Sequence, residues 1–200
     1  SIFIPKPFTP FCYERHITIE EASDITGKLI KDSNKCCKLI FAPNTEFIMT
    51  AQKDEEFFKI LKESDLATPD SVGVMIGGKL QKKPFKARIP GQAYFRKILE
   101  TGEKEGWTFY LLGGTDDVVV KAKENIEKLF PKIKIVGYHD GYIEGEKEKE
   151  IIEEINKLQP NVLFVAMGHP KQEKWIYKHR KELKVDVAAG QGGTFDYEAG

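Results

Sequence analysis

Along the chain, short continuous runs of hydrophobic residues alternate with segments in which hydrophobic residues recur at helical spacing, most regularly in the second half. Apolar runs that end near glycine or a polar turn predict strands, and they lie within residues 107–114, 132–142, 161–168 and 184–196. Apolar side chains at helical spacing predict helices at residues 115–130, 146–158 and 170–183. Strands and helices that alternate through short connections are typical of a mostly parallel sheet with right-handed crossovers.

The first half begins with a predicted helix at residues 17–32. Thr18 is placed as its N-cap and Glu21 three residues later, which is a capping-box pattern. The apolar run at residues 38–44 then predicts a buried strand that ends at Pro43 and Asn44.

Residues 45–64 are helical in pattern, either as one helix or as two that meet near Lys53 and Asp54. Residues 65–80 predict a brief strand, a Pro-Asp turn and a short helix from Val72 to about Leu80. Residues 1–200 are therefore expected to form a single α/β domain, a Rossmann-like, doubly wound, mostly parallel sheet with helices on both faces.

Composition narrows the functional classes. The 200 residues include 31 basic and 31 acidic side chains, a formal net charge of zero. A chain of this length buries roughly 70% of its unfolded surface, so folding needs no disulfide or metal. Zero net charge argues against nucleic acid as a partner.

The cysteines and the hydrophobic runs bear on location. Cys12, Cys36 and Cys37 are an odd number without paired metal or redox spacing, which favours a reducing compartment. The N-terminal residues show no signal-peptide pattern, and no run approaches a membrane span. We expect a soluble or peripheral protein in the cytoplasm.

Open α/β sheets bind ligands beyond the carboxyl ends of their strands, so the loops there are the candidate site. Several of these loops carry glycine next to a helix start, where backbone N–H groups can meet a phosphate. The chain has no P-loop pattern, and the glycine-rich run at residues 190–195 lacks the last glycine of a dinucleotide fingerprint.

Five residues in these loops are candidates for chemistry, each with a structural alternative. Asp70 follows a strand as a carboxylate for catalysis, or it caps the next helix. Arg88 can bind a diphosphate with its planar guanidinium, or it is an ordinary surface arginine. Asn44 can meet a sugar hydroxyl or cap a helix, and Gly113 and Gly114 can approach a phosphate or only permit a turn.

No metal site is expected. The four histidines, His16, His139, His169 and His179, lack the spacing of a zinc motif. Asp116 and Asp117 start a helix and are not arranged as the D-x-D pattern of metal-dependent sugar-nucleotide enzymes.

Taken together, the loops resemble the WecG/TagA/CpsF glycosyltransferases, family 26. The motifs that carry the resemblance are FAPNTE (41–46), AQKD (51–54), DLATPDSVGV (65–74), KKPFKARIPG (82–91), YLLGG (110–114), HDGY (139–142), PKQEKWI (170–176) and GGTFD (192–196). The resemblance implies transfer of N-acetylmannosamine from UDP-N-acetylmannosamine to the 4-hydroxyl of N-acetylglucosamine on undecaprenyl diphosphate. It further implies an inverting reaction without metal or cofactor, in the synthesis of wall teichoic acid or a related surface polysaccharide.

The resemblance also implies roles for individual residues. Asp70 matches the general base, and Arg88 matches the residue that engages the diphosphate. The remaining matches are Asn44 and Gln172 as polar active-site residues, and Tyr142 and Asp196 near the nucleotide. Gly113 and Gly114 are further candidates for substrate binding because of their place at a strand end.

The chain departs from the family pattern at several points. Ala42 stands where the family usually has threonine, Ser71 where glycine is common, and Ala93 and Tyr94 within a segment that commonly holds aspartate. The family's basic, aromatic C-terminal segment would follow Gly200, so we expect a catalytic core whose contact with the inner membrane leaflet depends on that segment.

Other interpretations stay open at this stage. The same fold class serves NAD-dependent oxidoreductases, and Ala42 is compatible with a noncatalytic nucleotide-sugar-binding protein. The apolar spacing at residues 46–61 serves either self-association into a homo-oligomer or core packing.

Overall fold

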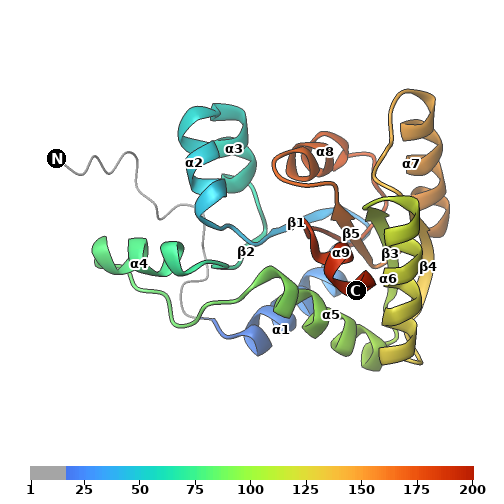
Figure 1. Ribbon diagram of the computed structural model, residues 1–200, viewed down its shortest axis with the longest axis horizontal. Coiled ribbons are helices and arrows are strands. Elements are labelled where there is room, and N and C mark those ends of the chain that lie inside the picture. The colour runs from blue at the N-terminus through green and yellow to red at the C-terminus, as the bar shows by residue number, and fades with distance from the viewer. Residues whose placement is uncertain (1–16) are drawn as a thin grey trace.

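The computed structural model describes residues 17–200, so Cys12 and His16 lie outside the described residues. The elements are α1 (Ile19–Asp32), β1 (Lys38–Phe41), α2 (Thr45–Lys53), α3 (Glu55–Lys62), β2 (Leu66–Ala67), α4 (Val72–Leu80), α5 (Gly91–Glu105), β3 (Thr108–Gly113), α6 (Asp116–Leu129), β4 (Lys134–His139), α7 (Glu146–Leu158), β5 (Val162–Ala166), α8 (Lys171–His179), β6 (Val187–Gly190) and α9 (Thr194–Ala199) (Figure 1).

One six-stranded sheet organises these elements, in the order β2-β1-β6-β5-β3-β4. Every strand pair is parallel, which confirms the predicted α/β fold with a parallel sheet. β1 and β6 are neighbours in the sheet although they are far apart in the chain. At such a switch in strand order, the loops beyond the carboxyl ends diverge and leave a crevice.

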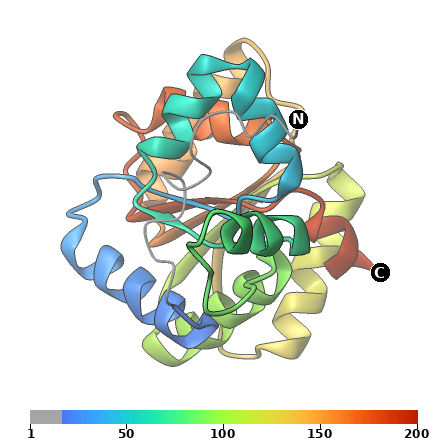
Figure 2. The same ribbon diagram turned by 90° about the vertical axis from the view of Figure 1, so that its left-hand side faces the viewer.

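Helices cover both faces of the sheet (Figure 2). Alternate strand residues point to opposite faces, so Tyr110 and Leu112 pack with α3, α7 and α8, whereas Phe109 and Leu111 pack with α1, α5 and α6. The two apolar clusters enclose the sheet from both sides, as the doubly wound prediction required.

Local sequence signals set several element boundaries as predicted. Thr18 and Glu21 form the capping box of α1. Asp54 separates α2 from α3, and its carboxylate accepts the Phe57 N–H of α3 at 3.0 Å. The residue 45–64 pattern is therefore two helices. Their apolar residues, such as Phe57, are buried in the core, which favours core packing over self-association for residues 46–61.

Two elements differ from the sequence-based expectation. The helix expected at residues 170–183 ends at His179, and the N–H groups of Glu182 and Leu183 both bond to the His179 carbonyl at 3.0 Å in a turn. Leu183 is buried, so its place in the core prolonged the helical pattern beyond the helix itself.

α5 occupies residues 91–105, where no helix is predicted from the sequence. Its Phe95, Ile98 and Leu99 are fully buried. α9 is likewise a helix where only a loop after the last strand was expected.

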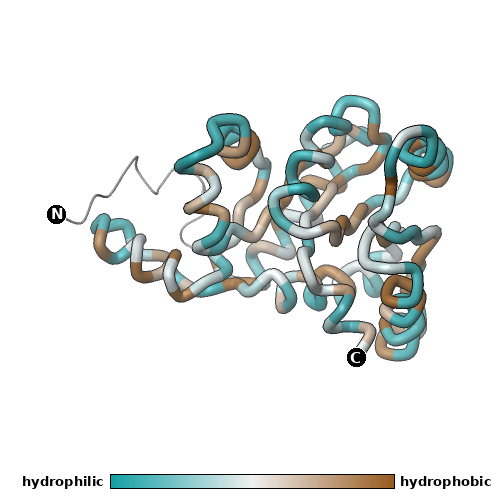
Figure 3. Tube along the Cα trace, turned by 45° about the horizontal axis from the view of Figure 1, so that its top comes forward, coloured by the Kyte–Doolittle hydropathy of each residue, from teal (hydrophilic) through white to brown (hydrophobic). Residues whose placement is uncertain are grey.

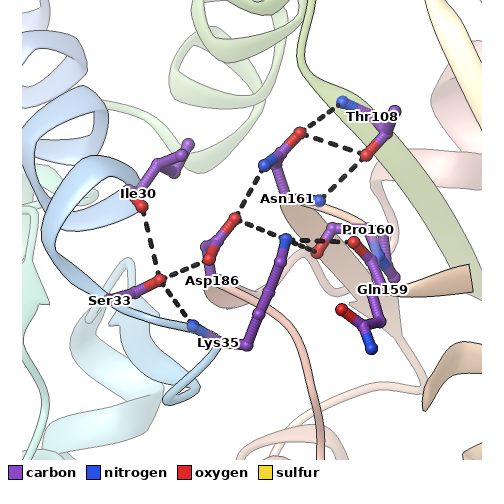
Figure 4. A network of polar contacts seen from close by, with 8 residues as sticks. All are labelled: Ile30, Ser33, Lys35, Thr108, Gln159, Pro160, Asn161 and Asp186. Carbon is purple, nitrogen blue, oxygen red and sulfur yellow. Dashed lines mark hydrogen bonds and ion pairs between the residues drawn. The ribbon is translucent and has the colours of Figure 1, made fainter.

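A polar network closes the amino end of the sheet (Figure 4). Asp186, which precedes β6, accepts hydrogen bonds from Lys35 Nζ at 2.8 Å and Asn161 Nδ2 at 2.7 Å, and it also bonds to Ser33. Asn161 Oδ1 in turn accepts the Thr108 N–H at 2.9 Å. The network joins the starts of β3, β5 and β6 at the edge opposite to the carboxyl-end loops.

α4 stands at one end of the molecule and carries hydrophobic residues along its length (Figure 3). Val72, Ile76 and Leu80, each one helical turn from the next, are 57%, 53% and 68% exposed. Across residues 17–200, none of the helices is both long and apolar enough to span a membrane.

Candidate active site

A cavity of about 570 Å³ opens beyond the carboxyl ends of β1, β2, β5 and β6. It lies at the switch in strand order, as expected for this type of sheet. The residues that line it come from five separate loops and helix starts: Ala42, Asn44, Glu46, Phe47, Asp70, Pro90, Gly91, Gln92, Gly168, His169, Gln172, Gly190, Gln191, Gly192, Gly193, Thr194 and Tyr197. Three of the predicted site residues, Asn44, Asp70 and Gln172, meet here.

Asp70 lies in the loop after β2, and the structure shows that it does not cap the following helix, while its catalytic role stays a prediction. Ser71, not Asp70, caps α4, because Ser71 Oγ accepts the Val74 N–H at 3.2 Å. The Asp70 carboxylate instead faces the first residue of α5, Gly91, whose N–H bonds to it. Asp70 is thus a cavity carboxylate at a helix start.

The surroundings of Asp70 alter its acidity. Burial raises the pKa of the Asp70 carboxyl above its usual range, and the Gly91 N–H and the Arg88 charge offset part of that rise. A carboxylate with a raised pKa holds a proton more tightly, as a general base requires.

Arg88 lies near Asp70 but on the exposed rim, outside the residues that line the cavity. Ile89 donates its N–H to the Pro69 carbonyl at 2.8 Å, which ties this loop to the Asp70 loop. Within residues 17–200, no side chain forms a hydrogen bond or ion pair with the Arg88 guanidinium. Its five N–H donors remain available to an anion.

Asn44 caps a helix and also lines the cavity, and its contact with a sugar hydroxyl stays a prediction. Its Oδ1 accepts the Phe47 N–H at 3.1 Å and so caps α2, and the side chain also lines the cavity. The cap orients the amide, because one of its atoms is committed to the helix.

Gln172 and His169 form the wall on the β5 side. Gln172 is buried, and its Oε1 accepts the Gly192 N–H at 2.9 Å from the loop after β6. The His169 ring stacks on Phe47 at 4.3 Å between centroids. His169 is not among the site residues predicted from the sequence. Its position directly after Gly168, at the end of a predicted strand, is the sequence feature that indicates it.

The glycines after β3 lie outside the cavity. Gly114 donates its N–H to the Ala166 carbonyl at 2.9 Å and accepts the Gly141 N–H at 2.9 Å. A Cβ on Gly113 would lie 2.2 Å from the Ala166 oxygen. Close backbone packing of three loops therefore accounts for both glycines, and their part in substrate binding stays a prediction.

Two further predicted residues also lie away from the cavity lining. Tyr142 is 70% exposed, and its N–H bonds to Asp140. Asp196 is exposed on α9 beside Gly193, which does line the cavity. Their position near a nucleotide stays a prediction.

The departures from the family pattern have distinct surroundings. Ala42 lines the cavity and lies 3.4 Å from the place a Cβ on Gly91 would take, so a larger side chain would meet α5. Tyr94 is buried, and its hydroxyl bonds to Thr26 Oγ1 at 2.7 Å between α5 and α1. Ala42 therefore belongs to the candidate site, and Tyr94 belongs to the packing of α5 against α1.

The remaining candidates for metal or thiol chemistry show no site. Across the described part of the chain, no three His, Cys, Asp or Glu side chains are grouped so as to hold a metal ion. Asp116 and Asp117 lie in the first turn of α6. Cys36 is exposed, and burial raises the pKa of the Cys37 thiol to about 12.

The fold and the cavity define an α/β protein with an opening where its parallel strands end, surrounded by a carboxylate, an exposed arginine and helix N-termini, which is the place where ligands bind in sheets of this type. Comparison with known families makes this specific. Residues 14–200 match the model of the glycosyl transferase WecG/TagA/CpsF family, and the chain belongs to that family.

Curated relatives agree with this assignment. The chain is 33% identical over 162 residues to a protein of Bacillus subtilis (strain 168), covering 81% of this chain and 62% of the relative. It is 32% identical over 169 residues to one of Bacillus spizizenii, covering 84% and 65%, and 30% identical over 161 residues to one of Staphylococcus aureus (strain NCTC 8325), covering 80% and 63%. All three are named N-acetylglucosaminyldiphosphoundecaprenol N-acetyl-beta-D-mannosaminyltransferase. The chain thus spans less than two thirds of the length of these relatives.

Proposed function

We propose that this protein transfers N-acetylmannosamine from UDP-N-acetylmannosamine to the 4-hydroxyl of undecaprenyl-diphosphate-linked N-acetylglucosamine. The observation that carries the proposal is Asp70, a cavity carboxylate with a raised pKa beside an exposed arginine. Membership of the family and the names of the relatives support the N-acetylmannosamine group and the undecaprenyl-diphosphate-linked acceptor, and the UDP donor and the 4-hydroxyl are part of the proposal. The product would enter teichoic acid or a related surface polysaccharide.

In the proposed mechanism, Asp70 takes the proton of the acceptor hydroxyl as that oxygen attacks the anomeric carbon of the donor. The bond from that carbon to the UDP oxygen breaks, and attack from the opposite side inverts the configuration. A base in this position contributes about 10²- to 10⁴-fold to the rate. The negative charge of the Asp70 carboxylate is neutralised when the proton arrives, which favours the transfer in a partly buried site.

Negative charge also develops on the departing UDP. Arg88 is the candidate to bind it, since its guanidinium forks match phosphate oxygens and lie next to the cavity. The start of α5 at Gly91 adds backbone N–H groups with the positive end of the helix dipole. These groups would stabilise the leaving group directly, so the proposal assigns no role to a metal.

We further propose that the protein works as a peripheral protein on the cytoplasmic face of the cell membrane, where a polyprenyl-linked acceptor resides. Two features support this location. The exposed apolar stripe on α4 begins two residues after Asp70. The following residues 79–88 contain five basic side chains and no acidic one, and each basic residue near an anionic leaflet contributes about 1 kcal/mol.

The test is turnover with UDP-N-acetylmannosamine and a lipid-linked N-acetylglucosamine acceptor, with an Asp70→Asn variant beside the unchanged chain. We expect kcat to fall by about 10²- to 10⁴-fold, with UDP affinity retained, because the amide keeps the shape but not the basicity. Equal rates in both proteins would exclude Asp70 as the base.

The assay also separates the alternatives. UDP-sugar binding without turnover, both in this chain and in a chain as long as its relatives, would indicate a noncatalytic binding protein. Saturable NADH binding without UDP binding would indicate an oxidoreductase. Gel filtration with light scattering, with and without vesicles, would show whether copies of the chain associate.

A further inference from the structure

Glu173 is a fully buried carboxylate directly behind the cavity wall, and it takes no part in the mechanism above. It is 0% exposed on the first turn of α8. Its Oε1 accepts a hydrogen bond from Gln172 Nε2, and its Oε2 lies 3.2 Å from His169 Nδ1. A buried carboxylate is costly unless its oxygens are hydrogen-bonded, so both contacts matter for the fold around it.

The first contact determines how the Gln172 amide is turned. An ionised carboxylate only accepts hydrogen bonds, so the Gln172 NH₂ group must face Glu173. Its Oε1 is then free to accept the Gly192 N–H at 2.9 Å. Glu173 thereby selects one of the two orientations of an amide that lines the cavity.

The second contact determines the state of the His169 ring. With its proton on Nδ1, the ring would donate to Glu173 while Nε2 accepts from Thr50 Oγ1, which lies 2.9 Å away. The ring is also stacked on Phe47. The imidazole thus contacts Glu173, Thr50, Phe47 and Phe57, and Glu173 is the one that faces Nδ1.

The end of β6 fits tightly against this group. A Cβ on Gly190 would lie 2.9 Å from both Gln172 Nε2 and Glu173 Oε1, so only glycine leaves room for the pair. Glu173 therefore connects the loop after β5, which carries His169, with the loop after β6, which Gln172 reaches.

We propose that Glu173 is the positioning residue of this active site, which fixes the orientation of Gln172 and the proton of His169 in the cavity wall. Its kinetic consequence rests on the proposed function, whereas its effect on His169 does not. Side chains held in one orientation before substrate arrives spare the reaction the cost of reorganisation.

The first measurement uses the unchanged protein. Long-range ¹H–¹⁵N NMR of the imidazoles reports which ring nitrogen carries the proton, with the His169 signals identified from a His169→Gln variant. We expect a proton on Nδ1. A neutral ring with its proton on Nε2 would overturn the proposal, whatever the protein's activity.

The second measurement compares Glu173→Gln with Glu148→Gln. Glu148 is a matched control, since it also holds α8 through side chains, accepting from Trp175 Nε1 at 2.9 Å and lying 3.1 Å from His179 Nε2, but outside the cavity. Glu173→Gln should lower kcat by about 10- to 100-fold with a smaller change in KM, and shift the His169 signals. Glu148→Gln should leave both unchanged.

The outcomes are distinct. Equal losses of kcat in the two variants would mean that Glu173 only stabilises α8, and an unchanged kcat in Glu173→Gln would remove its positioning role. If the unchanged protein lacked transfer activity, the proposed function would fail while the NMR readout of His169 and UDP titration of both variants still tested Glu173. If Glu173→Gln did not fold, the tautomer in the unchanged protein would decide.

Discussion

At Asp70, several neighbours act on a single carboxyl group. Burial in the cavity wall raises its pKa, while the Gly91 N–H and the Arg88 charge lower it in part. The cap of the following helix falls to Ser71, which leaves the Asp70 oxygens to the cavity. Asp70 precedes a helix and has the sequence position of a possible cap. Because Ser71 caps α4, the Asp70 carboxylate stays in the cavity.

The raised pKa of Asp70 has a consequence for stability. The folded state binds the Asp70 proton more tightly than the unfolded state, so the protonated form favours folding. That contribution is present below the unfolded pKa and is lost as pH rises through the folded pKa. At neutral pH the ionised, partly buried carboxylate therefore lowers the free energy of unfolding.

We predict that Asp70→Asn does not lower the free energy of unfolding at about pH 7 and raises it modestly, with the difference shrinking toward about pH 4. Urea denaturation of both proteins at the two pH values is the measurement. A variant that is less stable at neutral pH would show that the carboxylate supports the fold through Gly91.

Among the elements, two glycines at the carboxyl end of β3, Gly113 and Gly114, pack closely against neighbouring backbone. Gly113 has φ +142° and Gly114 has φ +69°, and both lie against the ends of β4 and β5. Gly145, before α7, also has a positive φ of +63°, but no atom lies within 4 Å of the place for its Cβ. A side chain at Gly113 would therefore meet both backbone strain and steric overlap, whereas a side chain at Gly145 would meet backbone strain alone.

We predict that Gly113→Ala lowers the free energy of unfolding by about 3 kcal/mol and Gly145→Ala by about 1 kcal/mol. Both changes force a left-handed backbone on alanine, but only the first also drives a methyl group into the Ala166 carbonyl. Chemical denaturation measures both. Equal losses would mean that the β3 loop relaxes without resistance.

Across the whole molecule, the polar network that stabilises the fold and the cavity of the candidate site lie at opposite ends of the parallel strands. The Asp186 network closes the amino end of the sheet (Figure 4). The cavity opens at the carboxyl end. At the carboxyl ends of β1, β2, β5 and β6, the proposed function requires polar groups that stay available in the cavity. The amino edge has no such demand, and its buried polar groups bond to one another.

Asp186→Ala should therefore destabilise the protein without altering the site. It leaves Ser33, Lys35 and Asn161 without their shared partner, and we expect a loss of about 2 to 4 kcal/mol. Scanning calorimetry measures the loss, and UDP titration well below the transition measures the site. Weakened UDP binding in the folded variant would contradict the separation of the two edges.

The sequence by itself determined the elements whose signals are local. The capping box at Thr18 and the apolar runs of the strands act between residues close in the chain, and both were confirmed. The pattern of residues 45–64 left one helix or two open, and the structure shows two that meet at Asp54. The parallel sheet followed from the alternation of strands and helices. The motifs led to the family, which the comparison confirmed.

Only the tertiary structure decided which loops meet. It placed Asn44, Asp70 and Gln172 around one cavity and left Gly113, Gly114 and Tyr142 outside its lining, because that depends on strand order, not on chain order. It also showed α5, which begins at Gly91, and the contact between His169 in the cavity wall and the buried Glu173 behind it. Burial, pKa and hydrogen-bond partners are properties of neighbours that are distant in sequence, so no local pattern encodes them.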